Sequence, residues 1–324
     1  MKILITGVSG YIGSILYHHL ISNYKTIGLD KKKDKYIRNI YCNLKIKNSI
    51  NILLKKIKPD LIIHLAGQSL VDETINKKKY LDNNVIATKN LINAMTKNGI
   101  NKIIFSSTAS VYKSSNKNLT ETSELKAENI YAKTKLECEK IIKNSKINYI
   151  ILRFFNVCSS FTIKNKIFGE YHNPETHLIP TIVYKNILKK KFFIYGNNYK
   201  TKDGTCIRDY IHVKDVCIAI EKSIKKIFKT NKVSEIINIG SSSSKTNLDI
   251  LKKVEKITKI NSIYKIINNR KGDVDKLTCS INKAKKILNW RPKYSSIKNI
   301  VNGEIRWVKF LIKNDKKRVF KNYF

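Results

Sequence analysis

Short, almost continuously apolar runs recur along the first half of the chain, and stretches with helical periodicity separate them. Five of these runs have the length of a β-strand, at residues 2–6, 25–30, 60–67, 102–107 and 148–155. The helical stretches follow residue 13 and cover residues 49–57, 85–98 and 132–142, with lysines on their outward faces. Strands with few polar positions belong in a parallel sheet that is covered on both faces. The alternating order therefore predicts an α/β fold, a doubly wound parallel sheet of the Rossmann type.

This alternation ends after Asn156. Residues 158–175 are polar and irregular, and the elements beyond them are shorter. A chain of 324 residues buries about three quarters of its unfolded surface, which is enough for two lobes. We expect residues 1–157 to form the first domain. Residues 158–324 should form mainly a smaller C-terminal α/β lobe that binds a substrate, with some segments returning to the first domain.

The first apolar run leads directly into a glycine-rich turn. Gly7, Gly10 and Gly13 lie between this strand and a helix, and Asp30 ends the second strand. Glycines at this spacing let the backbone approach a pyrophosphate at a helix N-terminus, and the acid can accept hydrogen bonds from a ribose. The pattern predicts a dinucleotide site and residues 1–157 as its domain. Asp30 repels a ribose 2′-phosphate, so we expect NAD rather than NADP, although lysines follow at 31–33.

Candidate catalytic residues follow in the helix at 132–142 and the strand before it. Tyr131 and Lys135 are four residues apart, so they share one face of the helix. A tyrosine has a pKa of about 10, and a nearby ammonium together with an oxidised nicotinamide favours its phenolate. Thr108 follows the strand end at Ser107, where such sheets bind ligands, and can hydrogen-bond Tyr131. These residues predict removal of a proton from a substrate hydroxyl while hydride leaves the same carbon.

The strongly basic composition does not change this interpretation. The chain has 64 Lys and Arg against 24 Asp and Glu, a net charge of +40. Its lysines are spread along the whole length together with abundant Ile and Asn, which suits an AT-rich genome better than a nucleic-acid groove. We therefore expect no nucleic-acid partner, although the charge should attract anionic substrates.

Cysteine spacing and hydropathy exclude further classes. The six cysteines form no C-x-x-C pair and no metal spacing, and the histidines show no ligand pattern, so we expect no metal. No apolar run approaches the length of a membrane span. We expect a soluble, cytoplasmic protein with no membrane partner.

The chain resembles the extended short-chain dehydrogenase/reductase family nearly end to end, and within it the branch of UDP-hexose 4-epimerases. The motifs that carry the resemblance are TGVSGYIGS (6–14), LIIHLAG (61–67), YLDNNV (80–85), FSSTASVY (105–112), YAKTK (131–135), LRFFNV (152–157), HNPETHLIP (172–180), DGTCIRDYIHVKD (203–215) and LNWRP (288–292). The block at 203–215 is the most discriminating. The resemblance implies a homodimer that epimerises carbon 4 of UDP-galactose or UDP-glucose through a 4-ketosugar, with tightly bound NAD.

The resemblance also implies two sets of binding residues. The cofactor would contact Gly7, Gly10, Tyr11, Ile12, Gly13, Asp30, Asn43, Leu44, Ala66, Asn84, Ser106, Lys135 and Phe154. The UDP-sugar would contact Thr108, Tyr131, Asn156, His177, Leu178, Tyr195, Arg208, Arg270, Asp273 and Leu277. The chain departs from the family in places: Asn43 replaces a common Asp, and Lys113 and Ile130 replace a glycine and a proline. Leucine at position 277 leans toward sugars without an N-acetyl group.

Other functions stay open. One is a related enzyme of the same family that acts on another nucleotide-sugar: a UDP-pentose, UDP-glucuronate or UDP-N-acetylhexosamine 4-epimerase, or a 4,6-dehydratase. A dehydratase usually carries an Asp-Glu pair after the strand-end threonine, where this chain has Ala109 and Ser110. The other is a cofactor-binding regulator or nucleic-acid binder without catalysis, against which the intact Tyr131 and Lys135 pair argues.

Overall fold

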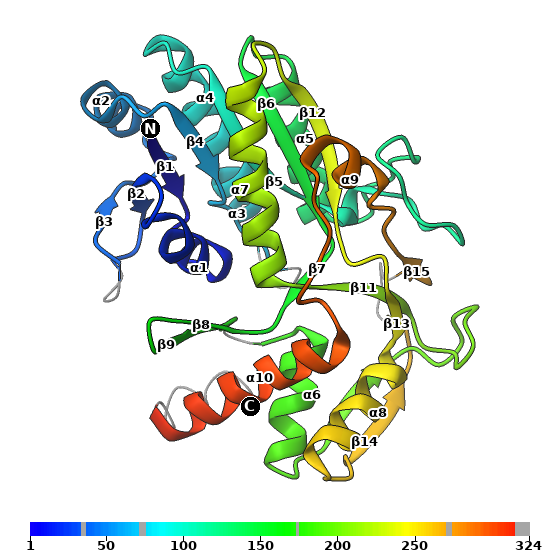
Figure 1. Ribbon diagram of the computed structural model, residues 1–324. Helices are drawn as coiled ribbons and strands as arrows, with labels where there is room; N and C mark the ends of the chain where they lie inside the picture. The colour runs from blue at the N-terminus through cyan, green and yellow to red at the C-terminus, as the bar shows by residue number, and fades with distance from the viewer. Residues whose placement is uncertain (34–36, 71–75, 173–174, 270–273, 315–324) are drawn as a thin grey trace.

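A seven-stranded sheet forms the centre of the larger lobe (Figure 1), in the order β12-β6-β5-β4-β1-β2-β3. The computed structural model describes residues 1–33, 37–70, 76–172, 175–269 and 274–314. The strands of this sheet are β1 (Lys2–Thr6), β2 (Lys25–Asp30), β3 (Asn39–Tyr41), β4 (Leu61–His64), β5 (Lys102–Thr108), β6 (Asn148–Phe154) and β12 (Ser234–Ile239). Each strand pairs in parallel with its neighbours. The predicted doubly wound parallel sheet is confirmed.

Helices cover both faces of this sheet because its strands are apolar on both sides. On one face α1 (Tyr11–Leu20), α7 (Val213–Lys229) and α9 (Asn282–Leu288) pack together over residues such as Ile3, Ile5 and Ile104. On the other face lie α2 (Lys47–Ile57), α4 (Ala87–Lys97) and α5 (Ile130–Lys143), over residues such as Leu4 and Ile62. The sheet therefore lies between two hydrophobic cores.

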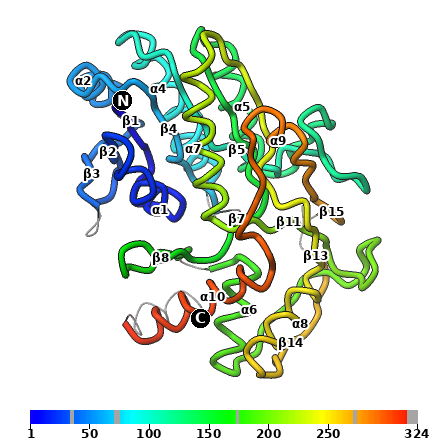
Figure 2. The backbone as a smooth tube through the Cα atoms, in the orientation of Figure 1, coloured from blue at the N-terminus to red at the C-terminus, as the bar shows by residue number. Residues whose placement is uncertain are grey.

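The smaller lobe has a third core of its own. A four-stranded sheet joins β7 (Asn156–Cys158), β11 (Ile207–His212), β13 (Ser244–Thr246) and β15 (Lys276–Leu277). Two further pairs are β8 (Phe161–Ile163) with β9 (Lys166–Phe168), and β10 (Phe192–Tyr195) with β14 (Tyr264–Ile267). The helices are α6 (Leu178–Ile187), α8 (Asn247–Thr258) and α10 (Ile297–Asn314). Figure 2 shows the chain entering this lobe after β7, returning to the large sheet through α7, and crossing again toward α8.

Several boundaries differ from the sequence prediction. The third predicted strand stops at His64, and the helix expected at 85–98 is preceded by α3 (Lys77–Tyr80) and a π-helical turn, η1 (Leu81–Ile86). A short 3₁₀ turn, η2 (Ala109–Val111), follows β5. The sequence analysis missed β3 and β12, because one has three residues and the other lies beyond the point where the β-α rhythm ends. No helix within the described ranges has the length and apolar character to cross a membrane.

A buried ion pair anchors α5 to the sheet. Arg153 of β6 donates from Nε and Nη2 to the two carboxylate oxygens of Glu139, at 2.9 and 2.7 Å. Ser107 of β5 donates to the same carboxylate. Both charged side chains are 2% exposed. The pair satisfies both carboxylate oxygens of Glu139 as well as Nε and Nη2 of Arg153, and it does so only while both partners are present. It therefore fixes the rotation and height of α5 over β5 and β6.

Replacing Glu139 with alanine should destabilise the protein by about 3–5 kcal/mol, because the Arg153 charge stays buried without its partner. The matched control is Glu137→Ala, which removes the surface partner of Lys140 and should cost about 0.5 kcal/mol or less. Urea unfolding of both variants with bound cofactor checks the difference. Equal unfolding midpoints would show that the buried pair contributes nothing special.

Candidate functional site

The glycine-rich turn connects β1 with α1 at the carboxyl end of the sheet. Gly7 has a φ of +75°, and a Cβ there would lie 2.6 Å from the backbone nitrogen of Ala66. A Cβ on Gly13 would lie 2.2 Å from the carbonyl oxygen of Gly7. Gly10 is the N-cap of α1 and offers no side-chain cap, so the first N–H groups of the helix stay available to an anion. The turn therefore has the tight backbone that a bound pyrophosphate requires.

The next strands bring further predicted cofactor residues to the same edge. Asp30 ends β2, and its carboxylate accepts the backbone N–H of Ser9 in the glycine turn at 3.1 Å. Asn43 lies just beyond β3, where its side-chain oxygen accepts the N–H of Lys45 at 3.1 Å. Leu44 is buried in the core beside α2, and Ala66 lies against Gly7. The order β4-β1-β2-β3 places these positions in sequence along one edge.

Four other predicted cofactor residues lie on α1, β5 and β6. Tyr11, in the first turn of α1, donates its hydroxyl to the carbonyl oxygen of Ser159 and so connects the two lobes. Ile12 packs against the core beneath α1. Ser106 donates to the carbonyl oxygen of His64 at 3.1 Å, and Phe154 ends β6.

The predicted catalytic residues meet where α5 begins above the end of β5. Asn129 caps α5 by accepting the N–H of Ala132 at 2.8 Å. Tyr131 and Lys135 follow on the first turns of this helix, and the hydroxyl of Thr108 lies close enough to Tyr131 to oppose the rise of its pKa. Thr108 is the last residue of β5. The structure therefore brings together the three residues for which the sequence predicts proton removal.

Burial acts on both titratable members of this group. It raises the pKa of Tyr131 to about 12, against the opposing effect of the hydrogen bond with Thr108. Burial also lowers the pKa of Lys135 to about 8. The lowered tyrosine pKa that the sequence analysis expects is therefore absent from the protein alone, because desolvation of the phenolate outweighs its neighbours. A further positive charge beside Tyr131 is needed to make it a base near neutral pH.

The side chain of Asn84 connects the loop after β4 with helix α5 through hydrogen bonds. Its side-chain oxygen accepts the N–H of Gln68 at 2.7 Å, and its nitrogen donates to Thr134 of α5 at 2.9 Å. Asn84 lies in the π-helical turn η1, a kind of distortion that is common at functional sites. A Cβ on Gly67 would lie 2.9 Å from the Asn84 oxygen and 3.9 Å from the Lys135 ammonium. Gly67, Gln68 and Thr134 thus belong to the site although the sequence analysis did not assign them; Gly67 was visible as the end of the LIIHLAG motif.

Three of the predicted substrate residues lie together in the smaller lobe. Asn156 begins β7 directly after β6, and β7 pairs with β11. Arg208 and Leu277 are register partners on β11 and β15. The Arg208 guanidinium donates from Nη1 to the carbonyl oxygen of Val274 at 2.7 Å, so part of its donor fork is engaged by the backbone.

The remaining predicted substrate residues that the structure describes lie on other elements of the smaller lobe, α6 and β10. His177 is the N-cap of α6, and Leu178 is the first residue of that helix. Tyr195 ends β10 in a separate two-stranded sheet, beside a surface hollow of about 520 Å³ that Lys265 and Ile267 help to line. Arg270 and Asp273 lie outside the described residues.

The sequence analysis also missed a cluster of acidic and imidazole side chains in the smaller lobe. Its members are Glu170, His172, Glu175 and His177. Only His177 was singled out, as a substrate contact. The alternation of Glu and His over residues 170–177 was the available signal, and it lay inside a motif interpreted only for its resemblance.

Comparison with known proteins agrees with this geometry. Residues 3–240 match the NAD dependent epimerase/dehydratase family. The chain is 35% identical to a UDP-glucose 4-epimerase of Lactobacillus helveticus, over 95% of this chain and 97% of that protein. Its fold is similar to the crystal structure of UDP-glucose 4-epimerase from Bifidobacterium longum in complex with NAD⁺ and UDP, with a TM-score of 0.87, 25% identity and full coverage of both chains. It is also similar to the UDP-Glc/GlcNAc 4-epimerase of Campylobacter jejuni, with a TM-score of 0.79, 29% identity and coverage of 95% and 99%.

Replacing Gly13 with alanine should weaken NAD binding by at least about tenfold, since the added Cβ collides with the Gly7 carbonyl and forces the turn open. Gly10→Ala is the graded comparison, because its Cβ would stay 3.2 Å from the same oxygen. The measurement is the NAD content of the purified proteins, followed by titration with NAD. If both variants keep the same NAD affinity as the parent, the glycine turn is not the dinucleotide site. Circular dichroism separates loss of binding from loss of fold.

Proposed function

The chain belongs to the NAD dependent epimerase/dehydratase family, and from this premise we propose that it interconverts UDP-galactose and UDP-glucose by inverting carbon 4 of the hexose. The observation that carries the proposal is the meeting of Thr108, Tyr131 and Lys135 at the sheet edge that also bears the glycine turn. Similarity to UDP-glucose 4-epimerases over nearly the whole chain supports the same activity.

The residues at the glycine turn fit NAD. The backbone of Gly7 and Gly13 leaves no room for side chains, which suits the close approach of a pyrophosphate, and Asp30 stands at the end of β2 for a ribose. Asn84 and Lys135 lie farther along the same edge, toward the catalytic residues. When bound, NAD would accept the hydride from carbon 4 and return it to the opposite face.

The side chains of this protein supply the proton chemistry. Tyr131 would take the proton of the 4-hydroxyl and later return it, and Thr108 would hold that phenol by its hydrogen bond. The Lys135 ammonium on the next turn favours the phenolate by its charge. Thr108 and Lys135 are buried and Tyr131 is half-buried, so little water reaches the group, which strengthens these interactions at the reacting carbon.

We also propose the division of labour between the two lobes. Residues 1–157 would bind NAD, while residues 158–324 would mainly hold the nucleotide-sugar, with β12 and parts of the helical cover returning to the first sheet. Asn156, His177, Leu178, Tyr195, Arg208, Arg270, Asp273 and Leu277 would contact the UDP-sugar. A firm grip on the UDP portion lets the keto-hexose turn over while it stays bound, because the binding energy is placed on the part that does not react.

The sugar range is the main alternative within this proposal. The similarity to an enzyme named for both UDP-Glc and UDP-GlcNAc favours a panel that includes the N-acetyl sugar. The bulk of the leucine side chain at position 277 leans toward the smaller hexose.

Oligomeric state and location complete the proposal. We propose a homodimer, from the resemblance to the family, and its mass in solution by light scattering would distinguish a dimer from a monomer of 37.5 kDa. We propose a cytoplasmic location, because the six cysteines are buried and form no disulfide, as in a reducing compartment; recovery in the cytosolic fraction checks it.

Purified protein with bound NAD should convert UDP-galactose to UDP-glucose without added reductant. Tyr131→Phe should lose about 10²–10⁴-fold in kcat and keep its NAD, because the variant lacks only the proton-transferring oxygen. Tyr149→Phe is the matched control, since Tyr149 lies near the start of β6, at the opposite end of the sheet. NMR of the product from a panel of UDP-sugars reads both rate and sugar range. Folded, NAD-loaded protein that converts none of the UDP-hexoses refutes the proposed activity, and full activity of Tyr131→Phe refutes the assigned base.

A further inference from the structure

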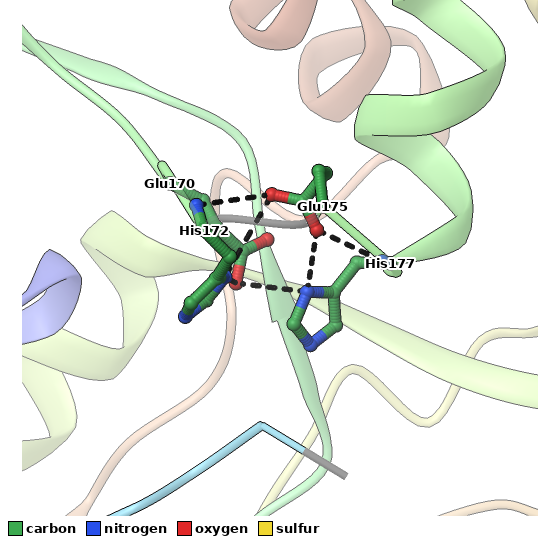
Figure 3. Close-up of side chains that lie close together, drawn as sticks. All are labelled: Glu170, His172, Glu175 and His177. Atoms are coloured by element: carbon green, nitrogen blue, oxygen red, sulfur yellow. Dashed lines mark hydrogen bonds and ion pairs between the residues drawn. The ribbon is translucent and has the colours of Figure 1, made fainter. Parts of the chain in front are cut away.

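Four titratable side chains converge in the smaller lobe, between the end of β9 and the start of α6. Glu170, His172, Glu175 and His177 turn toward one another (Figure 3), and one potential ligand atom from each lies within 4.8 Å of all the others. Both glutamates are buried, His172 is half-buried, and the side chain of His177 is 43% exposed. The cluster is therefore enclosed but open on one side, as a site that exchanges an ion with solvent requires.

The distances within this cluster are those of a coordination shell. Nδ1 of His172 lies 3.3 Å from Glu170 Oε1 and 3.7 Å from Glu175 Oε2. Nδ1 of His177 lies 3.4 Å from Glu170 Oε1 and 2.8 Å from Glu175 Oε1. A tetrahedral ion with bonds of about 2.0–2.1 Å separates its ligand atoms by about 3.3 Å. Because the ligand atoms lie within 4.8 Å of one another, the widest pair closes by at most about 1.5 Å around an ion.

The backbone prearranges one of the glutamates. The Glu175 carboxylate accepts the N–H of His177 at 2.9 Å and the N–H of His172 at 3.4 Å. The carbonyl oxygen of Glu170 accepts the indole N–H of Trp307, on α10, at 2.6 Å. These bonds hold the cluster in place from both sides, as the supporting contacts of metal ligands do.

Two buried polar atoms in the cluster make no hydrogen bond to any residue that the structure describes, which is an independent sign of a cation site. Among the described residues, Oε2 of Glu170 and Nδ1 of His172 have no hydrogen-bond partner. Glu170 is 4% exposed, so water does not compensate its carboxylate. Both carboxylate oxygens of Glu304, fully buried on α10, also lack a hydrogen-bond partner within that described part of the chain.

Acidic groups outnumber basic ones around the cluster. Glu304 of α10 is fully buried near Glu170 and Glu175. Three buried carboxyl groups therefore face two imidazoles, an arrangement that a divalent cation balances.

We propose that Glu170, His172, Glu175 and His177 bind one divalent transition-metal ion. Two imidazole nitrogens and two carboxylate oxygens match Zn²⁺ best, because imidazole selects zinc, copper, iron and nickel over magnesium and calcium. The ion connects the segment after β9 to the N-cap of α6 and thereby fixes the position of Leu178, the first residue of that helix. This structural site goes beyond the proposed epimerisation and does not depend on it.

The test measures metal binding rather than turnover. Full-length protein with bound NAD is treated with a chelator, dialysed, and titrated with Zn²⁺ by calorimetry and with Co²⁺ by visible absorption. We expect one equivalent of Zn²⁺ per chain, a Co²⁺ spectrum of a four-coordinate site, and a higher Tm with Zn²⁺. His172→Gln should weaken Zn²⁺ binding by at least about 100-fold, since even loss of a supporting contact to a metal ligand costs 10–100-fold.

The matched control is His19→Gln. His19 also contacts a glutamate at 2.9 Å, Glu221, but lies on α1 away from the cluster. This variant should bind Zn²⁺ as the parent does, and Glu170→Gln provides a second ligand variant in case His172→Gln folds poorly. The proposal is overturned if the parent binds less than about a tenth of an equivalent, in which case the cluster is a proton-sharing network only. It is also overturned if His172→Gln and Glu170→Gln bind as tightly as His19→Gln. Activity with UDP-galactose enters neither outcome, so failure of the proposed function leaves this result interpretable.

Discussion

The catalytic geometry of this protein depends on the buried contact of Glu139 with Arg153 and Ser107. Glu139 lies one helical turn after Lys135, and Ser107 directly precedes Thr108. Anchoring Glu139 to β5 and β6 therefore sets the height and rotation of α5, and with them the meeting of Tyr131 and Thr108. The pair is worth little as net stabilisation, since burying two charges is costly, but its bidentate geometry admits one arrangement. It acts on position more than on stability.

A second constraint concerns charge inside the site. Burial raises the pKa of Tyr131 to about 12 and lowers that of Lys135 to about 8, so the protein by itself opposes the phenolate–ammonium pair that proton removal needs. Water exclusion is nevertheless required, because electrostatic interactions are strong only away from solvent. The two demands are compatible when an additional cation shares the site, as an oxidised nicotinamide would. In the proposed mechanism Tyr131 would then act as a base only in the loaded enzyme.

The parts of the fold that could be predicted are those encoded locally. Continuous apolar runs identify β1, β2, β5 and β6 almost to the residue, because a strand buried on both faces needs an unbroken run. The glycine turn was equally readable, since Gly7 and Gly13 leave no room for a side chain. The π-helical turn around Asn84 and the edge strand β12 were not, because their positions depend on hydrogen bonds to Thr134 and to β6, far away in sequence. The raised pKa of Tyr131 in the protein alone was not readable for the same reason, because burial is a tertiary property.

Some of the few acidic residues of this basic chain hold loops in place inside the protein. Lysine dominates the surface, yet several of the few acids are buried and each contacts a particular partner. Asp209 accepts backbone N–H groups of Ser241 and Ser242, and Asp215 accepts those of Lys293 and Tyr294. These aspartates belong to the most discriminating sequence block, but their contacts are to the chain itself rather than to an open site. The block therefore identifies the family through the loops it anchors.

The cluster around Glu170 differs in that its carboxylates face one another and two imidazoles, with a buried oxygen that has no hydrogen-bond partner among the described residues. Where the chain leaves such a buried carboxylate oxygen without a hydrogen bond, beside two imidazoles, a cation is the partner that the proposed site would supply.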